Sequence, residues 1–233
     1  MTTPLSGVDQ AVDQAAVQTP VQAPAPFTIR PARTDDAAEV ARLYEICLLT
    51  GSDGGDASAL TAEPRLLGEI YLGAYLRFAP ELAFVLVDPD VPATDPASVV
   101  GYVIGTADTA AFEATLDTEW WPALRERYPH AAFPAGSYDA GLAATVHGEH
   151  HSDPEVLARF PAHLHIDLLP RGQGGGNGRR MLTTLFDALR AAGAPGVHLG
   201  VSPTNTQATG FYAHIGFQTL TEDGSLLGLV LSA

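Results

Sequence analysis

The chain of 233 residues contains no lysine, and all 12 of its basic residues are arginine. A phosphate-binding P-loop needs a lysine after its second glycine, and enzymes that form a Schiff base need a lysine amine. The absence of lysine therefore excludes both kinds of chemistry.

Cysteine is nearly absent as well, because Cys47 is the only one in the sequence. A single thiol excludes an intrachain disulfide and a thiolate metal cluster. Cys47 lies in the apolar stretch from Leu43 to Leu49, where helical spacing predicts a buried core thiol rather than a nucleophile.

Long apolar runs are missing too. A membrane-spanning helix needs about 20 consecutive apolar residues, and no stretch of the sequence approaches that length. Residues 1–26 are rich in Ala, Gln, Pro and Thr and show no apolar periodicity, which predicts a disordered leader. This leader has no basic n-region and no apolar h-region, so it does not fit a secretory signal. We therefore expect a cytoplasmic protein.

Positive charge is scarce, since 27 acidic residues outweigh the arginines and give a net charge of -15. Nucleic acids and anionic membranes attract basic surfaces, so we expect neither as a partner. The acidity suits a cationic substrate such as an amine, and it equally suits the simpler role of keeping the protein soluble.

The order of the apolar patterns predicts a mixed α/β sheet, because strands alternate with helices and hairpins stand at both ends. Residues 128–161 have frequent Pro, Gly and His, and predict only short elements. Strands are expected at 27–33, 82–87, 99–106, 162–169, 197–201, 217–220 and 226–231. Helices are expected at 37–49, 64–78, 111–127, 178–192 and 205–214.

The segment from Gln173 to Gly178 places four glycines between a predicted strand and a predicted helix. Unobstructed backbone N–H groups at the positive end of a helix dipole form a site for a phosphate or pyrophosphate. Arg179 and Arg180 in the first helical turn oppose that dipole, which favours anionic phosphates bound nearby. A flexible turn is the alternative for the glycines alone. Their spacing does not fit the dinucleotide fingerprint G-x-G-x-x-G.

Two motifs together resemble those of the GNAT superfamily of N-acetyltransferases. The first, which resembles the superfamily's cofactor-binding motif, is Gln173-x-x-Gly176-x-Gly178. The second, which resembles the motif that closes its core, is Asn205-x-x-Ala208-x-x-Phe211-Tyr212-x-x-x-Gly216-Phe217. The resemblance implies an α/β (α+β) GNAT fold, with about 6–7 strands flanked by helices and a splay between residues 163–169 and 197–201. It also implies a single domain at 27–233 with an insertion at about 110–161.

A closer likeness extends through the N-terminal half. Four segments are similar to the acetyltransferase-like domain at the C-terminus of animal O-GlcNAcase and to its stand-alone bacterial relatives: residues 50–56, 66–68, 80–85 and 120–124. The animal domain is regarded as not using acetyl-CoA. This chain keeps a full set of turn glycines, which favours cofactor binding.

The resemblance implies acetyl-CoA as the co-substrate and no metal. The backbone of Leu168 and Leu169 would pair with the amides of pantetheine, and Asn205 would reach the cofactor. The remaining cofactor-binding residues that it implies are Gln173, Gly174, Gly175, Gly176, Gly178 and Arg179.

The resemblance also assigns the chemistry to two elements. Tyr212 occupies the position of the superfamily's tyrosine acid and would protonate the CoA thiolate, with plain core packing as the alternative. Alternation along the preceding strand places His163, His165 and Asp167 on one face. A primary amine is mostly protonated at neutral pH, so a base that removes its proton helps the transfer. We expect Asp167 or His165 to act as this base or to orient a water, and a substrate-positioning role is the alternative.

The pair His163 and His165 is similar to a histidine pair that accepts protons in arylalkylamine N-acetyltransferases, but it lies one residue closer to the glycine-rich turn. A β-bulge would absorb that difference. On the acceptor side, Asp53 and Asp56 are candidates for binding the amine, with simple turn residues as the alternative. The expected reaction is direct transfer of acetyl to a primary amine on a small molecule or peptide, and a homodimer is common in the superfamily.

Two rival functions stay open. His163-x-His165-x-Asp167 resembles the zinc signature of metallo-β-lactamase-type hydrolases, and three more histidines lie within residues 147–151. However, Leu168 replaces the last histidine of that signature, and zinc chemistry leaves the glycine-rich turn unexplained. The other rival is a pseudo-acetyltransferase module that keeps the fold, and binds acetyl-CoA or a partner, without catalysis.

Overall fold

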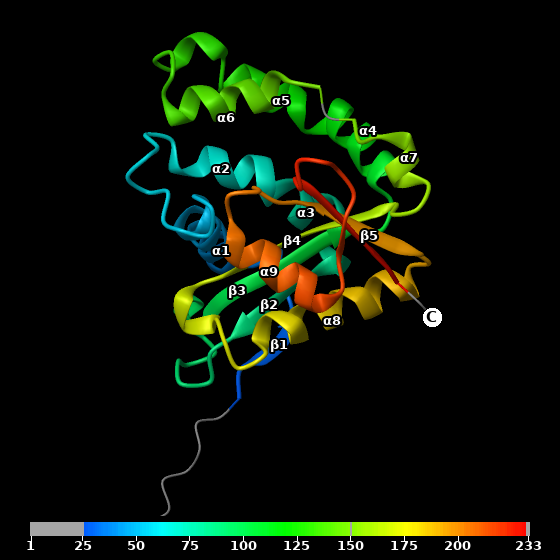
Figure 1. The fold of residues 1–233 in the computed structure, drawn as a ribbon. Helices are drawn as coiled ribbons and strands as arrows, with labels where there is room; N and C mark the ends of the chain where they lie inside the picture. The colour runs from blue at the N-terminus through cyan, green and yellow to red at the C-terminus, as the bar shows by residue number, and fades with distance from the viewer. Residues whose placement is uncertain (1–25, 150, 232–233) are drawn as a thin grey trace, which may run out of the picture.

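The computed structural model describes residues 26–149 and 151–231. The leader expected at residues 1–26 therefore lies outside the described residues, apart from Pro26. A seven-stranded sheet organises the chain, with the strand order β1-β2-β3-β4-β5-β7-β6 (Figure 1). Its strands are β1 (Thr28–Pro31), β2 (Ala83–Val87), β3 (Val99–Thr106), β4 (Ala162–Leu168), β5 (Gly196–Gly200), β6 (Gln218–Thr219) and β7 (Leu226–Val230).

The sheet is mixed, as predicted, because β4 and β5 pair in parallel and all other neighbours pair antiparallel. The parallel pairing covers only Ala162 with Val197 and His163 with His198, whereas β4 continues to Leu168. Beyond His198, β5 remains paired with β7 alone. The predicted splay between these strands is confirmed, and it opens the sheet beside the second half of β4.

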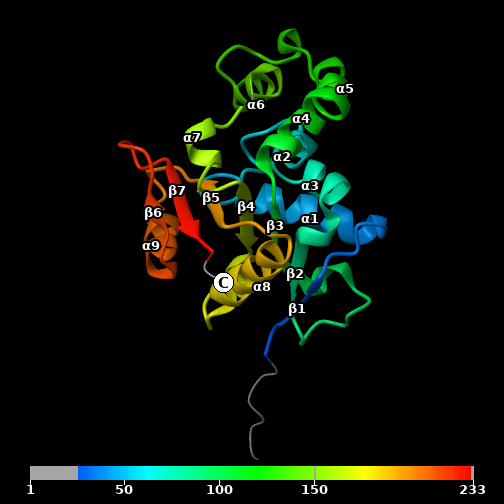
Figure 2. The same cartoon turned by 90° about the vertical axis from the view of Figure 1, so that its right-hand side faces the viewer.

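Helices cover both faces of the sheet (Figure 2). On one face lie α1 (Ala37–Thr50), α2 (Pro64–Tyr71) and α3 (Gly73–Phe78), and on the other lie α8 (Asn177–Ala191) and α9 (Thr206–Ile215). Side chains of a strand alternate between the faces, so Tyr102 and Ile104 of β3 pack with α1 while Val103 packs with α8. This alternation divides the core into two clusters, one on each side of the sheet.

α8 shows how the sequence produces these elements. Its Met181, Leu182, Leu185 and Leu189 recur at helical spacing and are fully buried against the sheet. Each leucine so buried stabilises the fold by about 1.5–3 kcal/mol. The helix ends at Gly193, whose φ of +87° favours glycine, and the next N–H donates to the Leu189 carbonyl at 3.0 Å. This pattern is a Schellman cap.

The segment expected to be an insertion lies between β3 and β4. It forms α4 (Thr109–Glu119), α5 (Trp121–Arg127), α6 (Tyr138–His147) and α7 (Pro154–Leu157). Both views place these helices together at one end of the molecule (Figures 1 and 2). Phe112, Trp121 and Leu142 pack on the α1 side of the core, and the Trp120 indole donates to the Glu69 carbonyl at 2.9 Å. The two tryptophans therefore have packing roles.

Three expectations about helices are wrong. The helix expected at 64–78 is interrupted at Leu72, which has φ −137°. The helix expected at 111–127 breaks at Trp120, because Pro122 follows and cannot donate to the preceding turn. Residues 128–161 contain more than short structure, since α6 has ten residues and an N-cap, Ser137, that accepts from Ala140. Within the part of the chain described here, no helix combines the length and the apolar character that crossing a membrane demands.

Candidate active site

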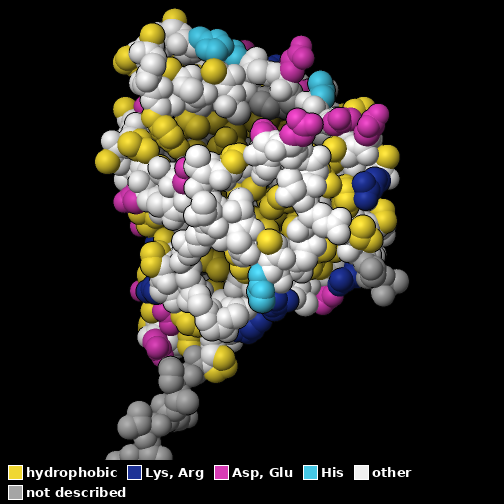
Figure 3. All heavy atoms as spheres, viewed as in Figure 1, with side chains coloured by type: hydrophobic (Ala, Val, Ile, Leu, Met, Phe, Trp, Pro, Cys, Tyr) yellow, Lys and Arg dark blue, Asp and Glu magenta, His cyan; other side chains and the backbone are white. Residues whose placement is uncertain are grey.

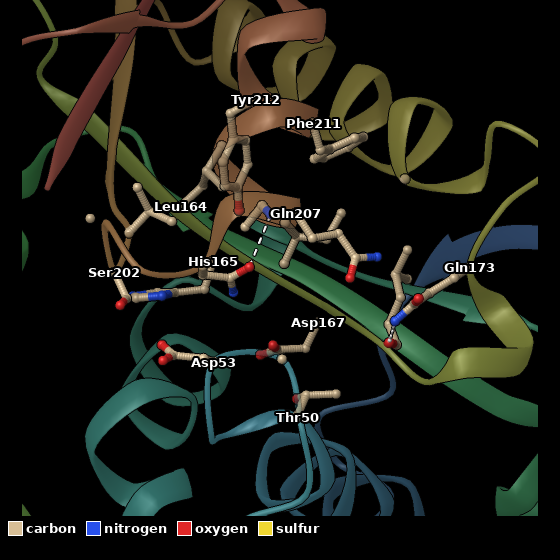
Figure 4. A pocket seen from close by; sticks show the side chains of 18 of the residues that line it. Thr50, Asp53, Leu164, His165, Asp167, Gln173, Ser202, Gln207, Phe211 and Tyr212 are labelled. Carbon is tan, nitrogen blue, oxygen red and sulfur yellow. Dashed lines mark hydrogen bonds between the residues drawn. The ribbon is translucent and has the colours of Figure 1, made fainter. Parts of the chain in front are cut away.

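A cleft of about 430 Å³ lies where β4 and β5 diverge. Figure 4 shows β4 along its back, α9 on one side and the loop after α1 on the other. The cleft lining brings together many of the predicted site residues, namely Asp53, His165, Asp167, Leu168, Gln173, Gly174, Gly178, Asn205 and Tyr212.

The glycine-rich turn stands at one end of the cleft. Gly174, Gly175 and Gly176 have φ values of +76°, +56° and +78°, a backbone region that glycine adopts without strain. A Cβ on any of the three would have no atom within 4 Å, so conformation, not crowding, requires glycine here. Among the described residues, no side chain caps the first turn of α8. The Asn177 and Arg180 N–H groups donate to the Gly174 and Gly176 carbonyls, each at 3.0 Å. Within the described residues, the N–H groups of Gly178 and Arg179 therefore remain for an anion.

Two contacts hold this turn against the cleft. The Gln173 side-chain amide donates to the Leu168 carbonyl at 2.9 Å, which ties the turn to the end of β4. A Cβ on Gly178 would lie 2.9 Å from Cζ of Phe211, so glycine at this position lets α9 pack directly on the start of α8. The structure thus joins the two GNAT-like motifs in space.

The other predicted cofactor contacts lie outside the lining. Arg179 is exposed, and its Nη2 donates to the His214 carbonyl at 3.3 Å. It lies in the first turn of α8, and Figure 3 shows basic side chains in blue over this part of the surface. The Leu169 N–H donates to the Val100 carbonyl of β3 at 2.8 Å, so this N–H is already used in strand pairing. Gly175 and Gly176 belong to the exposed side of the turn.

The polar face of β4 has two parts. His165 and Asp167 line the cleft, whereas His163 does not. Both ring nitrogens of His163 are occupied, Nε2 by the Tyr75 hydroxyl at 2.5 Å and Nδ1 by Thr109 Oγ1 at 2.7 Å. This geometry gives His163 no free nitrogen for the zinc chemistry considered above. β4 pairs with β3 in unbroken register through these residues, so the bulge that would re-space the histidine pair is not formed there.

Two titratable groups of β4 reach the cleft in different states. Burial raises the pKa of Asp167, and the hydrogen bond that it accepts from Tyr102 offsets this only in part. Burial lowers the pKa of His165 to about 4, so its imidazole is neutral at neutral pH. A carboxylate with increased proton affinity therefore lies beside a neutral imidazole.

Tyr212 projects from α9 into the cleft (Figure 4). Its ring packs against Phe217 with the centroids 5.5 Å apart, and the side chain is 8% exposed. Burial and the charge of Asp167 raise the pKa of Tyr212, so the hydroxyl keeps its proton. No described residue makes a hydrogen bond to this hydroxyl, which leaves it free to donate to a bound molecule.

The predicted acceptor side of the cleft lies where two loops meet. Asp53, with φ +49°, accepts a hydrogen bond from the Thr204 hydroxyl at 3.3 Å. Asn205 is the N-cap of α9 and accepts from the Ala208 N–H at 3.0 Å. Asp56 lies outside the cleft lining and accepts instead from the Ser58 N–H at 2.7 Å. Of the two aspartates predicted for the acceptor site, only Asp53 reaches the cleft.

Comparisons with known proteins agree with this geometry. Residues 101–217 match the family model described as "Acetyltransferase (GNAT) family". The chain is 37% identical to the protein in "Crystal structure of SsHAT", with a TM-score of 0.78, and the match covers 89% of this chain and 99% of that chain. The chain belongs to the GNAT acetyltransferase family.

This GNAT protein also matches O-GlcNAcase from Rattus norvegicus and from Mus musculus, with 28% identity over 195 residues in each case. The match covers 82% of the chain but 20% of either relative, so the chain spans about a fifth of the length of the curated relatives it matches. The crystal structure of PH1933 from Pyrococcus horikoshii OT3 is 17% identical, with a TM-score of 0.52 over 87% of this chain and 96% of that chain. That likeness shows the fold alone.

Several cleft residues of this GNAT protein were missed from the sequence. Thr50, Ser202 and Gln207 line the cleft. Thr50 opens the O-GlcNAcase-like segment 50–56 and Gln207 occupies a variable position of the second GNAT-like motif, so neither stood out, and Ser202 lies outside both motifs. Tyr102 contacts Asp167 from the neighbouring strand. Its position opposite Asp167 in the β3–β4 register was the one signal that strand pairing could have supplied.

Proposed function

We propose that this GNAT protein is an acetyl-CoA-dependent N-acetyltransferase that transfers acetyl directly to a primary amine. One observation carries the proposal. The cleft formed by the β4–β5 splay has an exposed glycine-rich turn at one end, and the Tyr212, His165 and Asp167 side chains line it farther along. Acetyl-CoA, when bound, supplies the acetyl group as a thioester.

The residues present fit that co-substrate. The exposed turn from Gly174 to Gly176 and the uncapped start of α8 offer N–H donors to the pyrophosphate. The half of β4 that leaves β5 offers backbone groups to an amide-containing chain. Gln173 already donates to the Leu168 carbonyl, so Gln173 positions the turn relative to this strand edge.

Tyr212 acts as the general acid in this proposal. Its raised pKa keeps the hydroxyl protonated, and its direction into the cleft allows it to donate to the leaving sulfur (Figure 4). A positioned acid of this kind contributes about 10²–10⁴-fold to a rate. Proton donation at sulfur stabilises the departing thiolate.

Asp167 acts as the proton acceptor, and neutral His165 orients the amine or a water next to it. Burial raises the pKa of Asp167, and a carboxylate with greater proton affinity is a better base. The two side chains project from the same face of β4, about 7 Å apart along the strand. One water can bridge part of that distance.

A cationic acceptor fits the wall of the cleft that lies opposite α9. Asp53 lies across the cleft from α9, near Asp167 and Thr50 (Figure 4). Carboxylates on two walls favour a protonated amine as it enters. We propose an amine on a small molecule or peptide.

The test is a screen of amines for acetyl-CoA-dependent thiol release, followed with a thiol-reactive dye. Polyamines, aminosugars, peptide N-termini and lysine peptides form the panel. Release that requires both an amine and the Tyr212 hydroxyl would support the proposal. If no amine on the panel increases thiol release although acetyl-CoA binds, the protein would be a non-catalytic acetyl-CoA-binding module.

A further inference from the structure

A chain of hydrogen bonds runs behind the cleft from β4 to the first residue of α4. His165 Nε2 lies 3.2 Å from the Tyr75 hydroxyl, which lies 2.5 Å from His163 Nε2. His163 Nδ1 lies 2.7 Å from Thr109 Oγ1, and that oxygen lies 2.6 Å from the Pro161 carbonyl. The chain therefore ends on a group that can only accept.

The Pro161 carbonyl at the end of the chain determines where each proton of the chain lies. A separation of 2.6 Å between two oxygens requires a proton between them, and a carbonyl has none to give. The Thr109 hydroxyl must therefore donate to Pro161. Because Thr109 has only one hydroxyl proton, its oxygen accepts from Nδ1–H of His163.

The same reasoning continues toward the cleft. Burial lowers the pKa of His163 well below its ordinary value, so the ring is neutral and has one N–H, which is already placed on Nδ1. Its Nε2 must then accept the Tyr75 hydroxyl proton. The Tyr75 oxygen is left to accept from Nε2–H of His165.

The tautomer of His165 follows. Its single N–H lies on Nε2, so Nδ1 has an unshared lone pair and no hydrogen-bond partner within the described residues. This ring lines the cleft, in contrast to His163. The opposite tautomer would present an N–H there, and could not accept from an amine.

We infer that Thr109, His163 and Tyr75 are positioning residues that hold His165 as the Nε2–H tautomer, with the Nδ1 lone pair ready to accept a hydrogen bond from the acceptor amine or its water. This inference rests on the proposed N-acetyltransferase function. It also gives the insertion a role in the chemistry, because Thr109 opens α4. His163 thus acts through His165 and does not itself contact the substrate.

Packing supports a fixed arrangement. Thr109 is 1% exposed and Tyr75 is 5% exposed. The Tyr75 ring stacks on Phe112 with the centroids 4.7 Å apart, and meets both histidine rings edge-on at 5.4 Å. Hydrogen bonds in so dry an environment are stronger than in water, and an unpaired member would be costly.

The first test reads the tautomers directly and does not depend on activity. Long-range ¹H–¹⁵N spectra of histidine-labelled protein, assigned with His163→Gln and His165→Gln, should show Nδ1–H for His163 and Nε2–H for His165. The opposite tautomer at His165, or a mixture, would overturn the inference. If the predicted tautomers are found but no amine is acetylated, the proposed function fails while the hydrogen-bond chain stands.

The second test breaks the chain far from the cleft. Thr109→Val should convert His165 to a mixture of tautomers and lower kcat about tenfold, the scale of one lost hydrogen bond, with KM for acetyl-CoA unchanged. Thr109→Ser keeps the hydroxyl, so it should retain the single tautomer of His165 and the wild-type kcat. Thr118→Val, an exposed site on the same helix, is the matched control and should behave as wild type.

Tyr75→Phe interrupts the chain at its centre and provides a second variant if Thr109→Val does not fold. It should show the same mixture and the same loss in kcat. Wild-type tautomers together with a kcat within twofold of wild type, in whichever of these variants folds, would contradict the positioning role.

Discussion

The Tyr102 hydroxyl on β3 donates a hydrogen bond to the Asp167 carboxylate on β4, and the two residues lie opposite each other in the strand register. Tyr102 is 1% exposed, on the side of the sheet covered by α1, whereas Asp167 borders the cleft. The neighbouring strand therefore holds the proposed base through a buried cross-strand hydrogen bond. Burial raises its pKa and this hydrogen bond lowers it.

Tyr102→Phe tests that balance. Removing the donor should raise the pKa of Asp167 further, so the acid limb of the kcat/KM profile should move to higher pH. The expected shift is about 1 pH unit, the scale of one hydrogen bond to a charged group. The readout is the pH–rate profile of kcat/KM for the amine, measured with subsaturating amine and saturating acetyl-CoA.

Tyr44→Phe is the control for this prediction. Tyr44 is also a buried tyrosine, and its hydroxyl donates to Glu69 at 3.1 Å, away from the cleft. This variant should lose a comparable amount of stability without moving the acid limb. A Tyr102→Phe profile that coincides with wild type would contradict the role of Asp167.

Tyr212→Phe removes the proposed general acid and keeps the ring that packs on Phe217. We expect kcat to fall by about 10²-fold or more, while the Kd for acetyl-CoA, measured by titration calorimetry, changes less than about threefold. A loss of binding with unchanged kcat would assign Tyr212 to cofactor packing instead.

The glycine turn can be tested with two matched substitutions. Gly174 (φ +76°) lies in the cleft lining, and Gly193 (φ +87°) follows the far end of α8. Both have open space where a Cβ would be. An alanine should cost about 1–2 kcal/mol at either site, because the backbone is left-handed. Only Gly174→Ala should also weaken acetyl-CoA binding, by about tenfold, since its N–H direction would change. Equal affinities in the two variants would remove the turn from the binding site.

Stability should depend on pH through the β4 histidines. The pKa of His165 falls from 6.5 to about 4 on folding, and that of His163 falls as well. A lowered pKa in the folded state gives stability that is complete above pH 6.5 and is lost as the pH falls toward 4. Within that window, each histidine lowers the free energy of unfolding by up to about 1.4 kcal/mol for every pH unit of acidification.

Urea denaturation at a series of pH values measures this effect. His165→Gln should make the curve less steep between pH 6.5 and 4, and the remaining slope should be that of His163. His214→Gln, an exposed site at the end of α9, should leave the curve unchanged. Parallel curves for wild type and His165→Gln would show that His165 is not desolvated in the folded protein.

Local patterns account for what the sequence predicted well. The alternation of His163, His165 and Asp167 with apolar residues gave the faces of β4. The turn glycines and the downstream Asn205 to Phe217 motif pointed to two segments that the structure brings together at the cleft. The splay came from the family resemblance. The faces of β4 depend on residues near one another in the chain, so periodicity was sufficient for them, whereas the splay and the pairing of the two motifs depended on the resemblance.

Contacts between distant segments account for what was missed. The link from Thr109 to His163 spans 54 residues and that from Asp53 to Thr204 spans 151, and neither leaves a mark in the local pattern. α6 has three alanines among its ten residues and lies in a segment with frequent Pro, Gly and His, so only short structure was expected there. Pro122 marks the break after α4 in the sequence itself, because proline lacks the N–H that a continuous helix over 111–127 would need.

Titration calorimetry of the whole protein with acetyl-CoA tests the central claim most directly. We predict a saturable isotherm with one site per chain and a Kd below millimolar, weakened by Gly174→Ala and unaffected by Gly193→Ala. An absence of binding at millimolar acetyl-CoA would contradict the assignment of the β4–β5 cleft as an acetyl-CoA site, and with it the proposed transfer.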